Sequence, residues 1–346
     1  MRKSNTSAGG INIELREFVP ELRACLLDGR NYPEQATSVE EIETHFALIY
    51  LTDEHAYKVK KPILWYDMDF RTQAARRLHC EEEVRLNRQL APAVYLGVET
   101  IGRDPAGRLR WNLSEAVEEH VVVMRRLPAA RMLDAVLSRG AIQAQELDAL
   151  IQMIRCFHER VAVFEVAGDD YLAHLRQYVT VHNELLARRR YGLPRDLLRA
   201  LYVHQLRSLE RHATIFRQRA DAGFIRECHG DLRPEHICLL DTPCAIDRLE
   251  FSRSLRTMDI VEEWALLCVE CIRLGHAEFA HELEGAALGN DGKAGEIWPF
   301  YLSKRALAKA KLCIWHLDDP DYAESRPWPE LAESCLELGL AALEKT

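Results

Sequence analysis

The sequence predicts an α+β protein of two lobes, in which a small antiparallel sheet with one long helix precedes a mostly helical lobe. Short apolar, β-rich runs separated by turn residues fill the first third of the chain, and long segments with helical periodicity follow. At 346 residues the chain is long enough to form two hydrophobic cores. We therefore expect a disordered leader over 1–14, an N-terminal lobe over 15–125 and a C-terminal lobe over 126–346.

The N-terminal lobe is expected to contain two hairpins, a further strand and one long helix. Pro92 ends the run of helical periodicity, and the Asp-Pro-Ala-Gly sequence at 104–107 is typical of a turn between strands. Ser38 with Glu41 matches a capping box and predicts a short helical turn. The strands are predicted at 44–51, 56–61, 95–101, 109–113 and 120–124, and the helix at 72–90.

The C-terminal lobe is expected to be helical except around residue 231. Asp259 and Glu262 match a capping box at the start of one of its helices. Arg305 and Lys309 could line a substrate cleft, although an i, i+4 pair of this kind is more often exposed. The helices are predicted at 143–161, 171–188, 194–219, 259–274, 277–288, 298–317 and 329–343.

Composition excludes several classes of function. The formal net charge is −9, whereas a protein that binds nucleic acid or an anionic membrane usually carries a basic field. No apolar run approaches the roughly 20 residues of a membrane-spanning helix, and residues 1–10 lack the apolar core of a secretory signal. The 10 cysteines are scattered and are expected to be reduced. We expect a cytoplasmic protein with neither a nucleic acid nor a membrane as partner.

Two aspartates on a predicted hairpin are the strongest sign of chemistry. Asp231 follows a glycine turn at the start of the hairpin, and Asp247 ends its second apolar strand. Such a hairpin brings two carboxylates together, an arrangement suited to metal-assisted phosphoryl transfer. Hydrolases and other metal sites could use the same arrangement, so further motifs must decide between them.

The hairpin and its context resemble a known family. The His-Gly-Asp-Leu sequence at 229–232 is similar to the signature of the aminoglycoside phosphotransferase-like kinases, the small-molecule branch of the protein-kinase-like superfamily. Asp247 follows where that family keeps its metal-binding aspartate. Lys58 on a predicted strand and Glu83 on the next helix resemble the family's lysine and its partner. The segment 121–128 resembles its inter-lobe hinge, so the resemblance implies the bilobal protein-kinase-like fold.

Further motifs narrow the resemblance to a bacterial subgroup of the family that is named only as aminoglycoside phosphotransferase-family enzymes. The resemblance to the family spans roughly 43–311, which is most of the chain. The subgroup motifs lie at 43–45, 57–62, 86–87, 90–92, 95–98 and 124–126. That name does not settle the substrate.

The resemblance implies a role for each matched residue. Asp231 is expected to accept or orient the proton of the attacking hydroxyl. Lys58 is expected to contact the nucleotide phosphates while Glu83 holds it in place. Lys60 competes for that role, because it lies on the same face of the strand. Met124 belongs to the hinge-like segment and is expected to lie at the nucleotide.

The resemblance also implies a metal site. Asp247 is expected to hold Mg²⁺, and Glu250 to aid the metal or the substrate. His236 stands where the family usually has asparagine, so we expect it to bind a softer metal such as Mn²⁺, to act through a hydrogen bond, or to leave one metal site empty. Arg233 replaces a common histidine and is expected to contact a phosphate. His229 is expected to hold the loop through a hydrogen bond.

Two functions follow as hypotheses. The first is an ATP- or GTP-dependent kinase that phosphorylates a hydroxyl of a small metabolite. The alternative is a non-catalytic, nucleotide-binding regulatory protein of the same fold, which His236 and the lack of a glycine-rich nucleotide loop favour.

Overall fold

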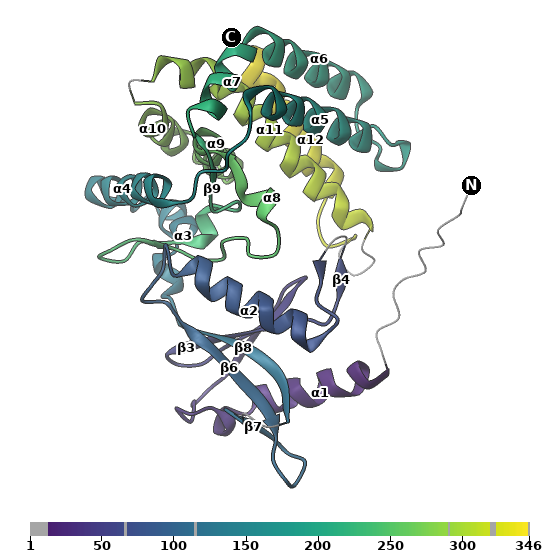
Figure 1. Cartoon of the computed structure of the whole chain (residues 1–346), viewed down its shortest axis with the longest axis vertical. Helices are drawn as coiled ribbons and strands as arrows, with labels where there is room; N and C mark the ends of the chain where they lie inside the picture. Colours follow the sequence, from purple (N-terminus) through teal and green to yellow (C-terminus); the bar gives the residue numbers. More distant parts are fainter. Residues whose placement is uncertain (1–12, 66–67, 114–115, 290, 319–322, 345–346) are drawn as a thin grey trace. The chain divides into compact units, whose positions relative to one another are not determined.

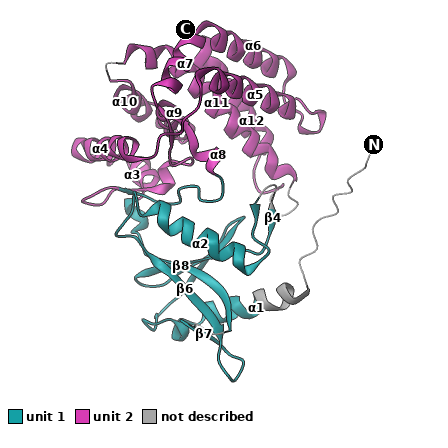
Figure 2. Cartoon of the chain, in the orientation of Figure 1, with its two compact units in different colours: residues 1–131, 244–252 teal, residues 132–243, 253–346 magenta. Residues whose placement is uncertain are grey.

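The computed structural model describes residues 13–65, 68–113, 116–289, 291–318 and 323–344 (Figure 1). The predicted leader lies almost entirely outside these residues. Two compact units are formed: the first comprises Met1–Arg131 and Cys244–Ser252, and the second Met132–Pro243 and Arg253–Thr346 (Figure 2). The predicted lobes divide the chain at residue 125 and place 244–252 in the second lobe, whereas in the structure the first unit extends to Arg131 and includes Cys244–Ser252.

The first unit is built on a six-stranded antiparallel sheet with the strand order β1-β2-β3-β8-β6-β7. The strands are β1 (Glu40–Glu43), β2 (Ala47–Leu51), β3 (His55–Lys60), β6 (Tyr95–Arg103), β7 (Leu109–Trp111) and β8 (Val117–Arg125). The helices of this unit are α1 (Ile13–Leu27) and α2 (Gln73–Asn87), and β4 (Leu64–Trp65) pairs with β5 (Met68–Asp69).

The two faces of β3 have different partners because successive side chains alternate along a strand. Tyr57 and Val59 are buried in a core that Leu22 and Leu26 of α1 also enter. Lys58 and Lys60 point to the opposite face and contact Glu83 of α2. Figure 1 shows α2 on that side of the sheet. The sheet therefore separates an apolar core on one face from a charged site on the other.

The start of the chain differs from the prediction. The structure forms the strand β1 at Glu40–Glu43, where the capping-box pattern predicted a helical turn. Pairing with β2 decides the conformation there, and Arg23 of α1 forms ion pairs with Glu41 and Glu43 of the strand. Helix α1 was not predicted either, although its Leu22 and Leu26 complete the core of the sheet.

The second unit is mostly helical, as predicted. Its helices are α3 (Leu133–Ser138), α4 (Ala144–Arg160), α5 (Gly168–Leu186), α6 (Arg195–Arg211), α7 (Ala213–Asp221), α8 (Arg253–Arg256), α9 (Ile260–Arg273), α10 (Ala277–Leu288), α11 (Gly292–Trp315) and α12 (Trp328–Glu344). Short strands lie at β9 (Ile225–Glu227), β10 (Ile237–Cys238) and β12 (Thr257–Asp259), and β11 (Cys244–Ala245) belongs to the first unit. Asp259 caps α9 by accepting a hydrogen bond from the Val261 N–H at 2.9 Å, as predicted. Glu262, the other residue of the predicted capping box, instead forms ion pairs with Lys304 and Arg305.

The helix predicted over 194–219 is broken into α6 and α7. His212 leaves the helical conformation with φ −107° and ψ 17°, which turns the following segment. Arg219 of α7 then forms a buried pair with Asp259, with its Nε 2.6 Å from Oδ2. Helical periodicity does not predict this break, because the pair of Arg219 with Asp259 joins segments that are distant in the sequence.

The structure bears on the expected state of the cysteines and on the search for a membrane-spanning helix. The ten cysteines all lie within the described residues and are free thiols. Over the described ranges, no helix combines the length and the apolar character needed to cross a membrane.

Candidate active site

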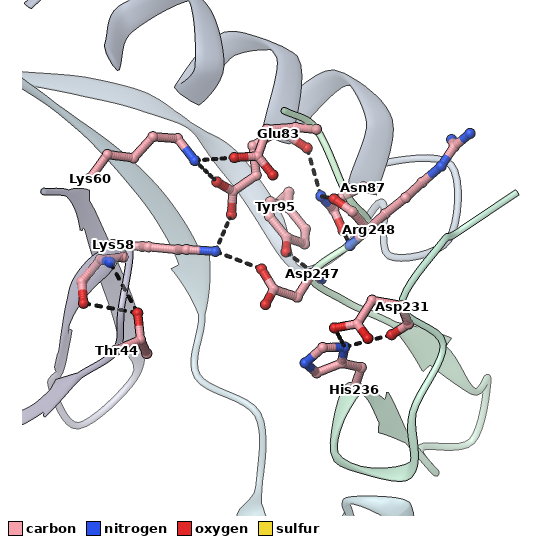
Figure 3. Close-up of polar contacts among 12 residues, drawn as sticks. Thr44, Lys58, Lys60, Glu83, Asn87, Tyr95, Asp231, His236, Asp247 and Arg248 are labelled. Atoms are coloured by element: carbon pink, nitrogen blue, oxygen red, sulfur yellow. Dashed lines mark hydrogen bonds and ion pairs between the residues drawn. The ribbon is translucent and has the colours of Figure 1, made fainter. Parts of the chain in front are cut away.

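Two lysines of β3 contact one buried glutamate. Lys58 and Lys60 lie two residues apart, so both side chains point toward α2. Lys58 Nζ is 2.9 Å from Glu83 Oε1, and Lys60 Nζ is 2.6 Å from Glu83 Oε2 (Figure 3). Glu83 is fully buried. The sequence did not decide whether Glu83 holds Lys58 or Lys60, and in the structure it contacts both.

Each lysine has a second carboxylate partner. Lys58 Nζ is 2.6 Å from Asp247 Oδ1, and Lys60 Nζ is 2.5 Å from Glu250 Oε1. The two pairs differ in exposure: the side chains of Lys58 and Asp247 are 13% and 44% exposed, and those of Lys60 and Glu250 are 3% and 7% exposed. Lys58 and Asp247 thus form the part of this network that solvent reaches, whereas the Lys60 pair is buried.

Burial and ion pairing together set the charges of this network. Burial alone would raise the pKa of Glu83, but the two adjacent lysines lower that pKa below its ordinary value. Burial would likewise lower the pKa of Lys58, yet the carboxylates of Asp247 and Glu83 raise it well above its ordinary value. At neutral pH Lys58 is therefore a cation held between two anions.

The backbone of Asp247 is fixed in an uncommon conformation. Its φ of 63° lies in the left-handed region, which aspartate adopts more easily than most residues. The Asp247 N–H donates to Tyr95 Oη at 3.0 Å, and the Arg248 N–H donates to Asn87 Oδ1 at 2.8 Å (Figure 3). Asn87 Nδ2 in turn donates to the Glu83 carbonyl at 2.9 Å. These contacts hold the Asp247 carboxylate beside the lysine, and retained strain of this kind is typical of functional sites.

Contacts among its own residues hold the loop that carries Asp231 in place. Gly230 has a φ of 87°, a conformation that favours glycine. His229 is fully buried, and its Nδ1 accepts a hydrogen bond from the Asp231 N–H at 3.3 Å, which is the loop-holding contact expected of it. The Asp231 side chain is 33% exposed, and its Oδ2 is 3.1 Å from Arg233 Nε. Arg233, a predicted phosphate contact, thus pairs with the predicted catalytic carboxylate.

His236 takes part in the same loop. Its Nδ1 is 2.8 Å from the Asp231 carbonyl oxygen, and its Nε2 is 2.8 Å from Arg233 Nη2. Because a carbonyl only accepts, Nδ1 carries the proton and Nε2 accepts from the guanidinium. Both ring nitrogens are therefore in hydrogen bonds, and a metal ion could bind His236 only by displacing one of them.

Sequence reasoning missed the residue that anchors this loop to α9. Glu263 is fully buried; its Oε1 accepts the Gly230 N–H at 2.8 Å, and its Oε2 is 2.8 Å from His158 Nε2. Two adjacent glutamates at 262–263 in a mostly apolar helix were the available signal, since buried carboxylates need partners. Potential ligand atoms of His158, Cys228 and Glu263 lie within 4.8 Å of one another, but the carboxylate already serves the loop.

Met124 lies near the end of β8. It is opposite Ala56 of β3 and Tyr95 of β6 in the sheet register, and it is 8% exposed. Its predicted contact with the nucleotide stays a prediction.

No protein-family model matches the chain. Uncharacterized proteins of Mycobacterium tuberculosis and Mycobacterium bovis are 29% identical to it over 283 residues, which cover 79% of this chain and 54% of theirs. The chain therefore spans about half the length of the curated relatives it matches.

Solved structures share the fold. The GDP complex of aminoglycoside 2'-phosphotransferase-IIIa superposes with a TM-score of 0.54 at 14% identity, covering 92% of this chain and 98% of the other. A choline/ethanolamine kinase family protein from Mesorhizobium loti gives 0.53 at 16% identity, covering 95% and 99%. The predicted fold is thereby confirmed: the chain has the fold of the protein-kinase-like small-molecule kinases.

Proposed function

We propose that this protein transfers the γ-phosphoryl group of ATP or GTP to a hydroxyl of a small molecule. The observation that carries the proposal is the contact of Lys58 with Glu83 and Asp247, on the strand, helix and segment at which a kinase binds its nucleotide phosphates. One solved structure with this fold is a GDP complex, which supports GTP as an alternative to ATP as the phosphate donor.

Lys58 binds the nucleotide phosphates in this proposal. Phosphoryl transfer needs charge stabilisation at a fixed place, and a lysine held by a buried glutamate is less mobile than a free one. The solvent contact of Lys58 leaves room for a phosphate to approach it, whereas Lys60 is enclosed between Glu83 and Glu250. We therefore assign Lys58 to the nucleotide and Lys60 to stabilising the first unit.

Asp231 acts on the acceptor hydroxyl. Its partly exposed carboxylate is fixed by the backbone hydrogen bonds of its loop, so it can accept or orient a hydroxyl proton. Arg233 lies beside it and neutralises charge that develops during transfer, which agrees with its predicted contact to a phosphate.

Asp247 suits a hard cation such as Mg²⁺, because its carboxylate is 44% exposed and its backbone is fixed on both sides. When bound, Mg²⁺ supplies neutralisation of the phosphate oxygens. Glu250 fits this role less well: its carboxylate is buried against Lys60, and burial raises its pKa. Asp247 is thus the residue of the first unit that would hold the metal.

Transfer of labelled γ-phosphate tests the proposed function. The purified protein is incubated with ATP or GTP, Mg²⁺ and the small-molecule fraction of a cell extract, and Asp231→Ala serves as the control. A new phosphorylated product should form with the wild type and fall by about 10²–10⁴ in rate with the variant. Equal nucleotide turnover by the two proteins would reject the proposal.

The alternative function is nucleotide binding without catalysis. The observation that favours it is the use of both His236 nitrogens within the loop, since the position that commonly supplies a second metal ligand is occupied by hydrogen bonds. Saturable nucleotide binding with no phosphate transfer to any acceptor would support this function. Metal-dependent transfer would exclude it.

A further inference from the structure

Three cations of α11 gather in the second unit with little opposing charge. Lys304, Arg305 and Lys311 form what we call the basic cluster. Lys304 Nζ forms an ion pair with Glu262 Oε1, and Arg305 Nε is 2.9 Å from the same oxygen. Across the described ranges, no carboxylate lies within 4.0 Å of Lys311 Nζ. Glu262 is therefore shared by Lys304 and Arg305, while Lys311 forms no ion pair among the described residues.

Two aromatic residues of α5 connect the lysines. Lys311 Nζ is 2.7 Å from His182 Nε2, and His182 Nδ1 is 2.7 Å from the Tyr178 carbonyl oxygen. The His182 ring stacks on the Tyr178 ring at a centroid distance of 3.8 Å, and Lys304 Nζ lies 4.1 Å from the Tyr178 centroid. Burial and Lys311 lower the pKa of His182 to about 4, so the imidazole is neutral at pH 7 and does not offset the charge of the lysines.

The electrostatics of the basic cluster favour an anion. Burial, against the pull of Glu262, lowers the pKa of Lys304 to about 8, and burial together with Lys304 and Arg305 lowers that of Lys311 to about 8. Buried charges are normally paired. A bound carboxylate or phosphate would supply the missing partner through charge-assisted hydrogen bonds. Lys311 and Tyr178 are only partly buried, so the cluster is not closed to solvent.

The basic cluster is also connected to the loop of Asp231 within the same unit. Arg305 Nη2 is 2.7 Å from Met258 Sδ, and the Met258 carbonyl accepts from Cys228 Sγ at 3.7 Å. Cys228 lies three residues before Asp231. Glu262, which binds the cluster, directly precedes Glu263, which holds the loop through Gly230. The anion site and the proposed catalytic carboxylate are thus joined through short chains of contacts.

We propose that the basic cluster binds an anionic group of the phosphate acceptor, so that the acceptor is an acidic alcohol, carrying a carboxylate or a phosphate, and not an amine. This inference rests on the proposed phosphotransferase function. It assigns a substrate class opposite in charge to choline or ethanolamine, because three cations would repel a cationic acceptor.

Ligand binding without nucleotide tests this assignment. Titration calorimetry with glycerate and glycerol 3-phosphate distinguishes a carboxylate from a phosphate, while glycerol and choline serve as neutral and cationic probes. We expect at least one anionic probe to bind the wild type, and its affinity to fall by about tenfold or more in Lys311→Met. Lys293→Met is the matched control, since Lys293 is an exposed lysine whose Nζ donates to Gln218 Oε1 at 3.0 Å. Thermal unfolding verifies that each variant is folded, and Lys304→Gln provides a second variant of the cluster.

Several outcomes would overturn the assignment: no saturable binding of either anion, tighter binding of choline than of both anions, or equal affinity of the wild type and Lys311→Met for the anionic probe. Lys58→Met separates this result from the proposed function, because it should keep the affinity for the anionic probe. Anion binding that depends on Lys311 without any phosphate transfer would reject the kinase function alone.

Discussion

Asp231→Asn should bind nucleotide with the affinity of the wild type and transfer phosphate about 10²–10⁴ times more slowly. The amide keeps the size of the side chain but cannot accept the hydroxyl proton. The contacts of the Asp231 carboxylate are with Arg233 and His236 of its own loop, so its neutralisation should leave the Lys58 network intact. The measurement compares the rate of γ-phosphate transfer with the nucleotide Kd.

Glu235→Gln is the matched control for this prediction, because Glu235 is an exposed carboxylate of the same loop. It should transfer phosphate at the wild-type rate. A similar loss in both variants would show that loop charge, and not the Asp231 carboxylate, governs the rate. An Asp231→Asn protein as fast as the wild type would remove Asp231 from the mechanism.

Glu83→Gln should lower the free energy of unfolding by about 3–5 kcal/mol, because it leaves the buried Lys60 and the partly buried Lys58 without their shared carboxylate. The exposed neighbour Glu81, which pairs with Arg77 on the surface of α2, provides the control. Glu81→Gln should change the free energy by no more than about 0.5 kcal/mol. Urea unfolding of the three proteins measures both values, and equal effects would show that burial of the Glu83 pairs does not matter.

The effect of Glu83→Gln should depend on pH. The pKa of Glu83 is lowered in the folded protein from its ordinary value of 4.5, so the folded state binds fewer protons in acid than the unfolded state does. The stabilisation by Glu83 is therefore complete above pH 4.5 and is lost as pH falls through the lowered pKa. The difference between the wild type and the variant should shrink over that acidic range. A constant difference would contradict the ion-pair explanation.

Local sequence periodicity was sufficient to predict many of the strands and helices. Alternating residues around Lys58 predicted β3, and the apolar stripe after Thr72 predicted α2, since both elements carry their own periodicity. Residues 40–43 were misread because a capping-box pattern also fits an edge strand, and only pairing with β2 distinguishes the two. The break at His212 likewise depends on where Arg219 must reach.

The candidate site was predictable where motif and charge agreed. The family resemblance implied the pairing of Glu83 with a lysine of β3, but the sequence could not separate Lys58 from Lys60 because both point to the same face. The two lysines differ in exposure, which depends on tertiary packing, and this difference is the basis for the proposed assignment of Lys58 to the nucleotide. The contacts of Asn87 with Arg248 and of Glu263 with Gly230 join distant segments, so no local pattern reports their role.

Nucleotide binding by Lys58→Met and Lys60→Met tests most directly the claim that Lys58 is the phosphate-binding lysine of a kinase site. Titration of both variants with ATP or GTP in the presence of Mg²⁺ gives the affinities, and urea unfolding gives the stabilities. Lys58→Met should lose nucleotide affinity by about tenfold or more and remain folded. Lys60→Met should be the less stable variant, because Glu250 is left buried without its lysine, and should bind nucleotide like the wild type wherever it is folded. Loss of affinity in Lys60→Met with wild-type binding by Lys58→Met would contradict the account.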